Sequence, residues 1–298
     1  MISEDAMIKN YLHDNKVWVD TYLADVLKDS LPEYQTLYDA MRYSLLLGGK
    51  RIRPILTKAV MEALGVSADA YKNVVCAIEL VHTYSLIHDD LPAMDDDDYR
   101  RGQLTNHKKF GEAMAILAGD GLLTEAFSLI GRPSAADAFQ QMACIKVLAD
   151  AAGPAGMVGG QAMDISSEGK ALPLEELQVL HRGKTGALFS AAVTIGLLLS
   201  RADEATTKAF QTYADYLGLL FQITDDILDV IGTIEELGKM PGSDERLDKS
   251  TYTSLLGLDG ARAKAQETAE AAKAALIDTK ADTTVLTALV DYLISRTN

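Results

Sequence analysis

The sequence is poor in the residues that interrupt or cross-link a chain. Its 298 residues include only seven prolines, two cysteines and one tryptophan. So few prolines leave long segments free to continue as helix, because a proline in a helix interior removes a hydrogen bond and clashes with the preceding turn. Cys76 and Cys144 stand alone, with no CxxC pair and no histidine at ligand spacing. This excludes a zinc site built on them and favours reduced core cysteines in a cytoplasmic protein.

Positive charge is also scarce. Lys and Arg number 28 against 43 Asp and Glu, which gives a net charge of −15. Such a surface repels nucleic acid and anionic membranes, so neither is the expected partner. The longest apolar run, about residues 186–199, is shorter than the ~20 residues that span a bilayer, and the acidic start of the sequence lacks a signal-peptide apolar region. We therefore expect no membrane insertion.

What the sequence does contain is long segments with a 3.6-residue apolar period, and no alternating strand pattern competes with them. The fold class predicted is all-α. No repeat, low-complexity tract or Gly/Ser linker divides the chain, so we expect a single domain over residues 1–298. The apolar periodicity predicts helices over residues 4–28, 33–47, 53–64, 68–91, 110–130, 134–151, 155–167, 173–183, 185–201, 203–231, 259–278 and 281–296.

Turn residues mark the expected breaks between these helices. They fall at Gly48-Gly49, at Leu91-Pro92 and around residues 131–133. Residues 238–249 collect Gly, Pro, Ser and Asp and are predicted to form a mobile polar loop. The segments 74–88, 185–199 and 214–231 are apolar nearly all round, which is typical of central helices in a large bundle.

Two aspartate clusters stand at the ends of two of these apolar segments. The first is Asp89-Asp90-Leu91-Pro92-Ala93-Met94-Asp95, and the second is Asp225-Asp226-Ile227-Leu228-Asp229. Carboxylates about 4 Å apart at an effective dielectric near 20 repel by roughly 4 kcal/mol per pair, so clusters beside apolar sequence predict divalent cations between them. Ligands that are all oxygen favour a hard ion, Mg²⁺ ahead of Ca²⁺ or Mn²⁺.

The spacing within each cluster suits a shared ion. Asp225 and Asp229 lie one turn apart on one helical face, with Asp226 turned aside and Gln222 a turn before Asp225. In the first cluster Pro92 disfavours continued helix and lets the chain loop back, so that Asp89 and Asp95 flank one cation together. For Asp96, Asp97 and Asp98, which follow, a solvated surface turn is as good an interpretation as a role at the metal.

The few cations occur in short groups beside these clusters, which suggests a small anionic ligand such as a phosphate. The GxxxxGK[ST] spacing of a nucleotide-binding loop is missing. His82 lies two turns before Asp89 on the same helical face and could contact such a ligand. Taken singly, each group is also compatible with a surface patch. The groups are Lys50, Arg51 and Arg53; Arg100 and Arg101; Arg182 and Lys184; and Lys239 and Lys249.

At this point the sequence resembles the short-chain trans-prenyl diphosphate synthases, and within them the farnesyl diphosphate synthases of bacteria. The resemblance covers nearly the whole chain. It rests on an ordered set of stretches: GGKRIRP from Gly48, HTYSLIHDDLPAMDDDDYRRG from His82, GGQAMD from Gly159, KTG from Lys184, FQITDDILD from Phe221 and KSTY from Lys249.

The resemblance implies an all-α bundle around a deep central cavity, a homodimer, and two aspartate motifs that face each other across the cavity mouth. It implies three Mg²⁺ ions, replaceable by Mn²⁺, held by Asp89, Asp95 and Asp225 with Asp90, Asp226 and Asp229 as direct or indirect partners. The implied ligands of the allylic diphosphate are Arg100, Lys184, Lys239 and Lys249, and those of isopentenyl diphosphate are Lys50, Arg53, His82 and Arg101.

The implied activity is condensation of isopentenyl diphosphate with dimethylallyl and geranyl diphosphate to farnesyl diphosphate, by ionisation, condensation and elimination. Thr185 and Gln222 would stabilise the allylic cation by their dipoles. Tyr84 lies five residues before Asp89, ~7.5 Å deeper along the helix, and with Ser85 beside it resembles the floor that limits chain length in the farnesyl type. An ordinary core tyrosine is the rival interpretation.

Three other functions stay open on the sequence. A geranylgeranyl diphosphate synthase would share the mechanism, a class I terpene cyclase would not need the second diphosphate site, and a non-catalytic helical subunit would merely retain the motifs. Two positions depart from common versions of the pattern. Ser243 stands where many relatives carry lysine, and Thr253 stands where proline commonly follows Ser-Thr-Tyr. Both bear on loop closure and leave the metal assignment intact.

Overall fold

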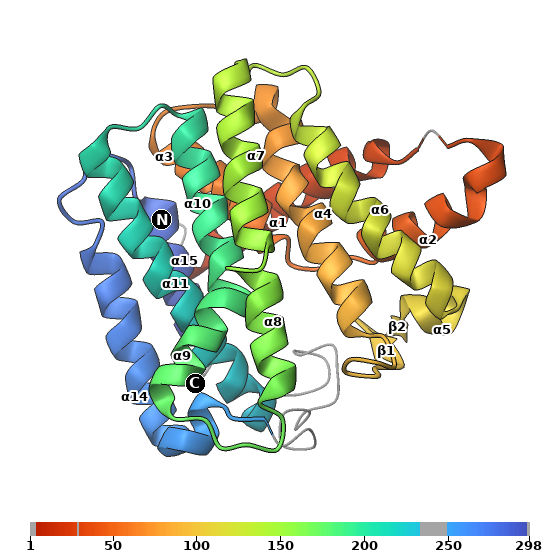
Figure 1. Cartoon of the computed structure of the whole chain (residues 1–298). Helices are drawn as coiled ribbons and strands as arrows, with labels where there is room; N and C mark the ends of the chain where they lie inside the picture. Colours follow the sequence, from red (N-terminus) through yellow and green to blue (C-terminus); the bar gives the residue numbers. More distant parts are fainter. Residues whose placement is uncertain (1–3, 29, 233–248, 297–298) are drawn as a thin grey trace. The chain divides into compact units, whose positions relative to one another are not determined.

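The structure is a computed structural model that describes residues 4–28, 30–232 and 249–296. Its regular structure is almost entirely helical (Figure 1), which confirms the all-α prediction. The helices are α1 (Glu4–Val26), η1 (Pro32–Tyr34), α2 (Gln35–Leu46), α3 (Ile52–Ala63), η2 (Asp69–Tyr71), α4 (Lys72–Asp89), α5 (Asn106–Phe110), α6 (Glu112–Ile130), α7 (Ala138–Ala152), α8 (Met157–Ser166), α9 (Leu174–His181), η3 (Arg182–Gly186), α10 (Ala187–Leu199), α11 (Glu204–Ile231), α14 (Tyr252–Ala274) and α15 (Thr284–Ser295).

The residues group into two compact units. Unit 1 comprises Met1–Ile8, Leu56–Ser67 and Lys146–Asn298, and unit 2 comprises Lys9–Ile55 and Ala68–Ile145. The single domain, the central cavity and the facing aspartate motifs all concern the arrangement of both units together. They therefore stay predictions.

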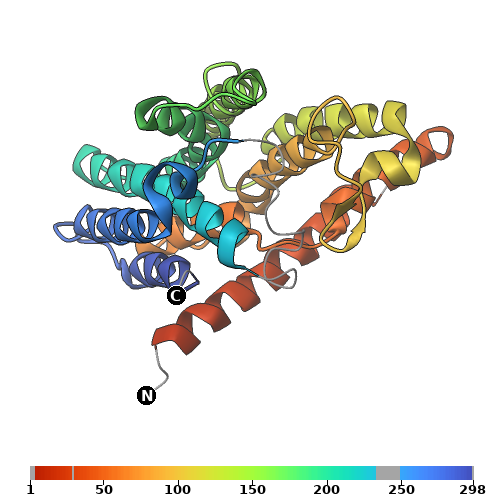
Figure 2. The same ribbon diagram turned by 90° about the horizontal axis from the view of Figure 1, so that it is seen from below.

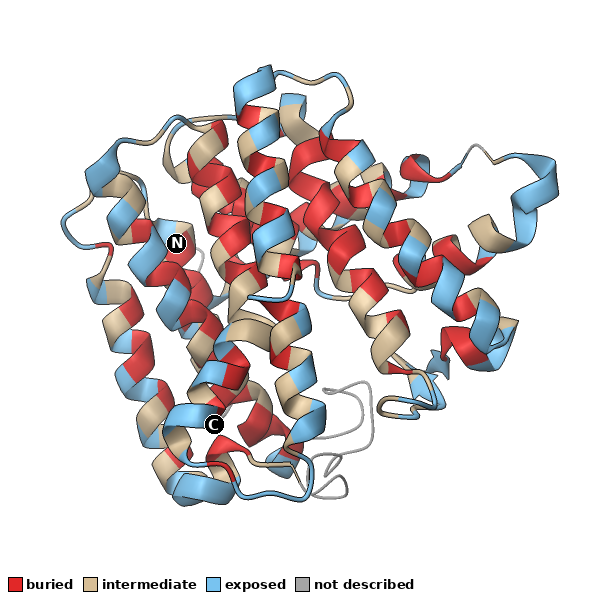
Figure 3. Ribbon diagram, in the orientation of Figure 1, coloured by how far each residue is buried: buried red, intermediate tan, exposed pale blue. Residues whose placement is uncertain are grey.

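In unit 2, α4 packs along α6 (Figure 1) and also contacts α2. Every residue of α4 from Val74 to Val81 is buried, which Figure 3 shows as a red stretch of the helix. Full burial of one Val, Leu or Ile side chain contributes roughly 1.5–3 kcal/mol, so this helix is a main source of stability in unit 2. The prediction that 74–88 is a central helix holds for this unit.

In unit 1, α11 packs against α10 and α14, and Figure 2 shows α11 and α14 side by side. Two buried polar groups tie these helices to their neighbours. The Thr57 hydroxyl donates to the Ala192 carbonyl at 2.9 Å, and the Tyr213 hydroxyl donates to the Leu286 carbonyl at 2.9 Å. Each bond satisfies a hydroxyl that would be costly to bury alone.

Several boundaries differ from those predicted. The helix expected over 259–278 begins at Tyr252, because the Thr251 side chain accepts from the Ser254 amide and the Ser254 hydroxyl oxygen accepts from the Thr251 amide. That reciprocal pair is a capping box. Gly257, at φ 70°, kinks the helix one turn later, and this kink hid the first turn from the apolar periodicity.

Two features were not predicted. A two-stranded antiparallel ladder pairs β1 (Tyr99–Arg100) with β2 (Gln103–Leu104), and strands of two residues are too short to show an alternating pattern. The expected break between 173–183 and 185–201 is instead a π-helical turn, η3, which joins α9 to α10. Such turns occur frequently at functional sites.

Two helical stretches, Glu112–Ile130 and Ala138–Ser166, are long and apolar enough to cross a membrane by length and composition. Core helices of soluble proteins pass the same test. The expected lack of membrane insertion therefore stays a prediction. Cys76 and Cys144 are buried and form no disulfide, in agreement with the sequence-based interpretation.

Candidate active site

The chain turns back immediately after α4. The helix ends at Asp89, and the Asp95 amide then donates to the Asp89 carbonyl at 2.9 Å. The Asp96 amide donates to the Leu91 carbonyl at 3.2 Å within the same turn. The return predicted from Pro92 is therefore present, and it places Asp95 next to Asp89. Two neighbouring carboxylates supply only oxygen, which fits a hard divalent cation.

Asp90, between these two aspartates, has a different partner. It is buried, and the Arg100 guanidinium grips it, with Nε at 2.8 and 2.9 Å from its two oxygens and Nη2 at 2.6 Å. Burial raises the pKa of Asp90, and the Arg100 charge offsets only part of that effect. In the structure Asp90 thus orients Arg100, so its predicted role near the metal would be indirect.

Arg101 connects the hairpin to the Gly48-Gly49 turn. It has a left-handed backbone, at φ 52°, and its guanidinium donates to the Gly48 carbonyl. A Cβ at Gly49 would lie 2.6 Å from that guanidinium. Glycine is therefore required at Gly49, where the φ of +124° also disfavours any side chain. The structure brings Arg101 beside the loop that carries Lys50, another predicted ligand of isopentenyl diphosphate.

Arg51, in the same loop, faces the interior. Its side chain is 1% exposed. It donates to Asp20 and to Glu79, both at 2.8 Å, and to the Leu45 carbonyl at 2.6 Å. Glu79 lies on α4 and is 2% exposed. Arg51 also has a left-handed backbone, at φ 53°, and strain of this kind persists only where neighbours fix it. Arg51 therefore anchors the loop between Lys50 and Arg53.

His82 lies one turn beyond Glu79 on α4, among the predicted cations. Desolvation, and then the charges of nearby arginines, hold the pKa of His82 well below its usual value. The imidazole is therefore neutral near pH 7, and it can offer a hydrogen bond but no charge. The arginines that act on it are Arg53, Arg101, Arg100 and Arg51, so the structure gathers the basic groups that the sequence places in two separate segments.

Tyr84 is buried one turn before His88 and packs edge-on against it, with ring centroids 5.6 Å apart. The neighbouring Ser85 hydroxyl donates to the His82 carbonyl at 2.9 Å. Both the chain-length floor and the ordinary core tyrosine are compatible with these contacts.

The second aspartate cluster, on α11 in unit 1, belongs to a chain of polar contacts. The Thr185 hydroxyl donates to Gln222 Oε1 at 2.9 Å, and Gln222 Nε2 donates to Asp226 at 2.8 Å. Asp226 also accepts from the Tyr252 amide at 2.7 Å. Asp226 is thus turned aside, as predicted, and accepts from the side-chain amide nitrogen of Gln222, while Thr185 engages the amide oxygen. Asp229 is buried, whereas Asp225 is partly exposed.

Two of the lysines predicted to bind the allylic diphosphate, Lys184 and Lys249, meet at one carboxylate. Lys184 Nζ lies 2.6 Å and Lys249 Nζ 3.3 Å from Asp164 Oδ2. Burial alone would raise the pKa of Asp164, but the two ammonium groups outweigh it and lower the pKa. The sequence-based assignment gave Asp164 no role. Its signal was a single acid at the end of the Gly159–Asp164 motif. Lys239 and Ser243 lie outside the described residues.

Thr253 lies in the first turn of α14. Its hydroxyl is 3.0 Å from that of Thr251. Thr251 is the N-cap of α14, so Thr253 adds a polar contact at the cap.

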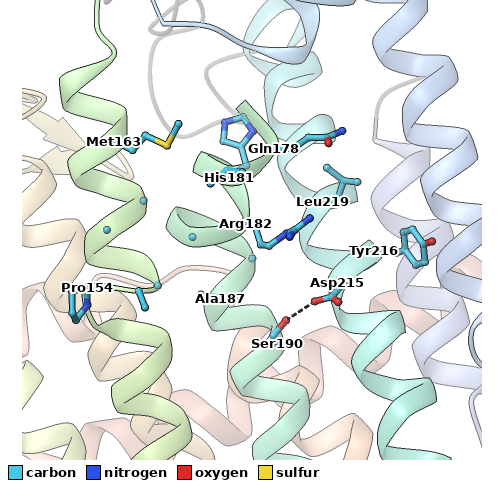
Figure 4. Close-up of a pocket in the computed structure, with 17 residues that line it drawn as sticks. Pro154, Met163, Gln178, His181, Arg182, Ala187, Ser190, Asp215, Tyr216 and Leu219 are labelled. Carbon is cyan, nitrogen blue, oxygen red and sulfur yellow. Dashed lines mark hydrogen bonds between the residues drawn. The ribbon is translucent and has the colours of Figure 1, made fainter. Parts of the chain in front are cut away.

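The π-helical turn η3 holds Lys184 and Thr185 against α8. A Cβ at Gly160 would lie 2.1 Å from the Lys184 amide nitrogen, so only glycine permits this backbone contact. A cavity of about 610 Å³ (Figure 4) is lined by residues of η3, α8, α9, α10 and α11. Arg182 lines the cavity whereas Lys184 does not. The structure thus separates Arg182 from Lys184, with which the sequence groups it.

The chain is similar to known proteins over most of its length. A sequence model described as polyprenyl synthetase matches residues 34–293. The farnesyl diphosphate synthase of Geobacillus stearothermophilus is 47% identical over 97% of this chain and 98% of its own length. That of Escherichia coli K12 is 49% identical over 87% of this chain and 88% of its own. A solved structure, an FPP/GFPP synthase from Zymomonas mobilis, matches with a TM-score of 0.86 and 34% identity over 97% of this chain and 99% of its own.

Proposed function

The chain belongs to the polyprenyl synthetase family, and from that premise we propose that it is a prenyltransferase that makes farnesyl diphosphate. Isopentenyl diphosphate would be joined first to dimethylallyl diphosphate and then to geranyl diphosphate, with release of diphosphate at each step. The observation that carries the proposal is the backbone return after α4. It sets Asp95 beside Asp89 at the end of a helix that also bears His82 among four arginines.

Magnesium is the proposed cofactor. Asp89 and Asp95 in unit 2 and Asp225 in unit 1 would hold three Mg²⁺ ions, and Mn²⁺ would substitute. When bound, the ions supply Lewis acidity that stabilises the charge of a departing diphosphate. The donor set offers only oxygen, and Asp225 is partly exposed, which fits this use.

The remaining residues divide by the diphosphate that they would bind. Lys50, Arg53, His82 and Arg101 would hold isopentenyl diphosphate, with His82 donating a hydrogen bond from a neutral ring. Arg100, Lys184, Lys239 and Lys249 would hold the allylic diphosphate. Fixed cations of this kind stabilise the charge that develops as the carbon–oxygen bond breaks.

The allylic cation would be stabilised by oxygen dipoles. Because Gln222 Nε2 is engaged by Asp226, the orientation of its amide is fixed, and its oxygen is the group that meets Thr185. Neither group is a base. The proton lost after condensation would therefore pass to an oxygen of the diphosphate product, which is the strongest acceptor expected beside it.

The proposed function and its alternative, a geranylgeranyl diphosphate synthase, differ in the length of the prenyl product. Tyr84 would stop a growing C15 tail, whereas a geranylgeranyl diphosphate synthase would need the floor to lie deeper. The names of the similar relatives favour the C15 product. A terpene cyclase is disfavoured because it would have no use for the second cation group, and a non-catalytic subunit is disfavoured because both aspartate motifs are complete.

A homodimer in the cytoplasm is part of the proposal. Unit 2 exposes large apolar side chains on α6 and α7, namely Ile116, Leu117, Phe139 and Met142. Large exposed apolar side chains mark surfaces that another chain covers where they form a contiguous patch.

Product analysis tests the function. Purified protein would be incubated with Mg²⁺, isopentenyl diphosphate and dimethylallyl diphosphate, and the dephosphorylated alcohols separated. Farnesol should dominate in the wild type, and Tyr84→Ala should shift the products to C20 or longer while Tyr84→Phe should not. Asp89→Ala and Asp225→Ala should abolish turnover with an unchanged helical circular dichroism spectrum. Asp215→Ala, on the same helix as Asp225, is the matched control and should stay active.

Each part of the proposal can fail separately. Condensation without farnesol would keep the prenyltransferase and reject the C15 assignment. An unchanged product from Tyr84→Ala would remove Tyr84 as the floor. No consumption of isopentenyl diphosphate with either allylic substrate would reject prenyl transfer itself.

A further inference from the structure

His107, in the first turn of α5, has a ring nitrogen that its surroundings leave unused. The residue is 6% exposed. Its Nδ1 lies 3.1 Å from the Thr105 hydroxyl oxygen, and that hydroxyl donates to the Asp97 carbonyl at 2.8 Å. Because the hydroxyl hydrogen is committed to Asp97, the Thr105 oxygen accepts the proton carried by Nδ1. This fixes the tautomer and leaves a lone pair on Nε2.

That Nε2 atom is buried and has no hydrogen-bond partner within the described ranges of the chain. A buried nitrogen with an unused lone pair carries a desolvation cost of about 1–3 kcal/mol. In a protein this cost is normally offset by a water, a polar partner or a metal ion. The unused lone pair is therefore an observation that points to a ligand.

Two carboxylates lie within reach of the same ring. One ligand atom from each of Asp96, Asp98 and His107 lies within 4.8 Å of the other two. Ligand atoms ~2.1 Å from a tetrahedral ion are roughly 3.4 Å apart. The two aspartates are exposed, so rotation of their side chains can close the remaining distance.

The backbone holds these carboxylates in place. Asp96 has a left-handed conformation, at φ 51°, and its amide is bonded to the Leu91 carbonyl. The Thr105 amide donates to the Asp98 carbonyl at 2.9 Å. Lys108 pairs with Oδ1 of Asp98 at 2.6 Å, which leaves the other oxygen of that carboxylate for a metal.

We propose that Asp96, Asp98 and His107 form a Zn²⁺ site, separate from the carboxylate-only magnesium ligands. One imidazole and two carboxylates form a mixed nitrogen and oxygen donor set, which suits Zn²⁺ and its close analogue Co²⁺ better than Mg²⁺. A water would complete the tetrahedron. Thr105 would act as the outer partner that fixes the ring and its tautomer.

The site would tie the turn that follows the first aspartate motif to the start of α5. Residues 96–98 lie directly after Asp95, so a metal bound there would stiffen the segment that carries Asp95. This proposal is independent of prenyl transfer, since it concerns metal binding by the chain alone.

Co²⁺ binding to metal-free, full-length protein tests the proposal. The titration would be run in excess Mg²⁺ without substrate, so that the carboxylate-only sites are occupied by Mg²⁺. One Co²⁺ per chain should bind with the intense visible absorption of a tetrahedral site, and Zn²⁺ should displace it. His107→Gln should abolish this absorption, and Thr105→Val should weaken Co²⁺ binding about 10–100-fold.

Asp96 and Asp98 are both exposed, so replacing them tests the site without disturbing the core. Asp96→Asn/Asp98→Asn changes only surface side chains and should also abolish the absorption. His13→Gln removes an exposed histidine on α1 and should bind Co²⁺ as the wild type does. Absence of tetrahedral absorption in the wild type would overturn the proposal, and so would wild-type binding in the double aspartate variant.

Discussion

The two units fix their cations in different ways. In unit 2, two arginines are held by specific carboxylates: Arg51 by buried Glu79 and half-buried Asp20, and Arg100 by both oxygens of buried Asp90. Unit 1 uses lysines, and both Lys184 and Lys249 rest on the single carboxylate of Asp164. A guanidinium fork locks geometry, whereas an ammonium group is a compact and mobile charge. The two arginines of unit 2 are therefore fixed in place before a ligand binds. The lysines of unit 1 are paired with Asp164, so an anionic ligand must compete with this carboxylate for them.

The largest expected effect comes from breaking the buried pair in unit 2. Arg51→Met leaves Glu79 buried without its cation, and loss of one partner of a buried ion pair costs about 3–5 kcal/mol. Urea denaturation should show a loss of this size in the free energy of unfolding. Arg201→Met is the control, because Arg201 has the same left-handed backbone, at φ 53°, but is exposed.

The double variant Arg51→Met/Glu79→Leu sharpens this result. Removing both charges should restore most of the stability, because the cost lies in the unpaired carboxylate and not in the loss of attraction. If Arg51→Met alone left the unfolding midpoint unchanged, the ion pair would not be what holds the loop between Lys50 and Arg53.

A smaller loss is expected from the shared carboxylate of unit 1. Asp164→Asn should lower the free energy of unfolding by about 2 kcal/mol, the scale of hydrogen bonds to charged groups. The loss should be below that of Arg51→Met because the Lys184 side chain is 25% exposed and can reach water. The KM for the allylic diphosphate should not rise, since both lysine charges remain.

Acid provides a second measure of the same contact. Because the pKa of Asp164 is lowered in the folded protein, its contribution to stability is complete above the ordinary carboxyl pKa and is lost as the pH falls through the lowered value. The variant should therefore lose less stability than the wild type between neutral and strongly acidic pH. Asp150→Asn breaks the exposed pair with Lys146 and should match the wild type throughout. A higher allylic KM in Asp164→Asn would contradict the competition between Asp164 and the ligand.

The smallest expected effect lies at the cap that carries Tyr252. Thr251→Ala removes the side-chain acceptor of the α14 capping box and should cost ~1 kcal/mol in urea denaturation. Thr283 occupies the N-cap of α15 without a side-chain bond, so Thr283→Ala should cost clearly less. Equal losses would show that the box contributes nothing beyond an ordinary threonine.

The parts of this molecule that sequence predicts are those set by local pattern. The helical class, the burial of residues 74–81 and the return after Pro92 all follow from periodicity and from one proline. The position of Asp226 on α11 follows from helical geometry alone. Each of these depends on neighbours within a few residues.

The parts that sequence missed depend on contacts distant in the chain. Arg51 is one of three closely spaced cations in its segment, and only its distance to Glu79 distinguishes an anchor from a ligand group. Asp164 becomes significant once Lys184 and Lys249 converge on it from 20 and 85 positions downstream. The same holds for the unused nitrogen of His107, since burial is not visible in a single sequence.

The π-helical turn η3 limits which deletions this chain can tolerate. A π turn holds one residue more than a regular helical turn, so everything after it is rotated by about 100° relative to an uninterrupted helix. Deleting one residue from η3 would restore regular geometry, but it would also rotate the buried face of α10, including Leu188 and Phe189, out of the core. The hydrophobic packing of α10 therefore constrains the length of the turn that presents Lys184 and Thr185. A single-residue deletion in η3 would prevent correct folding, whatever its direct effect on activity.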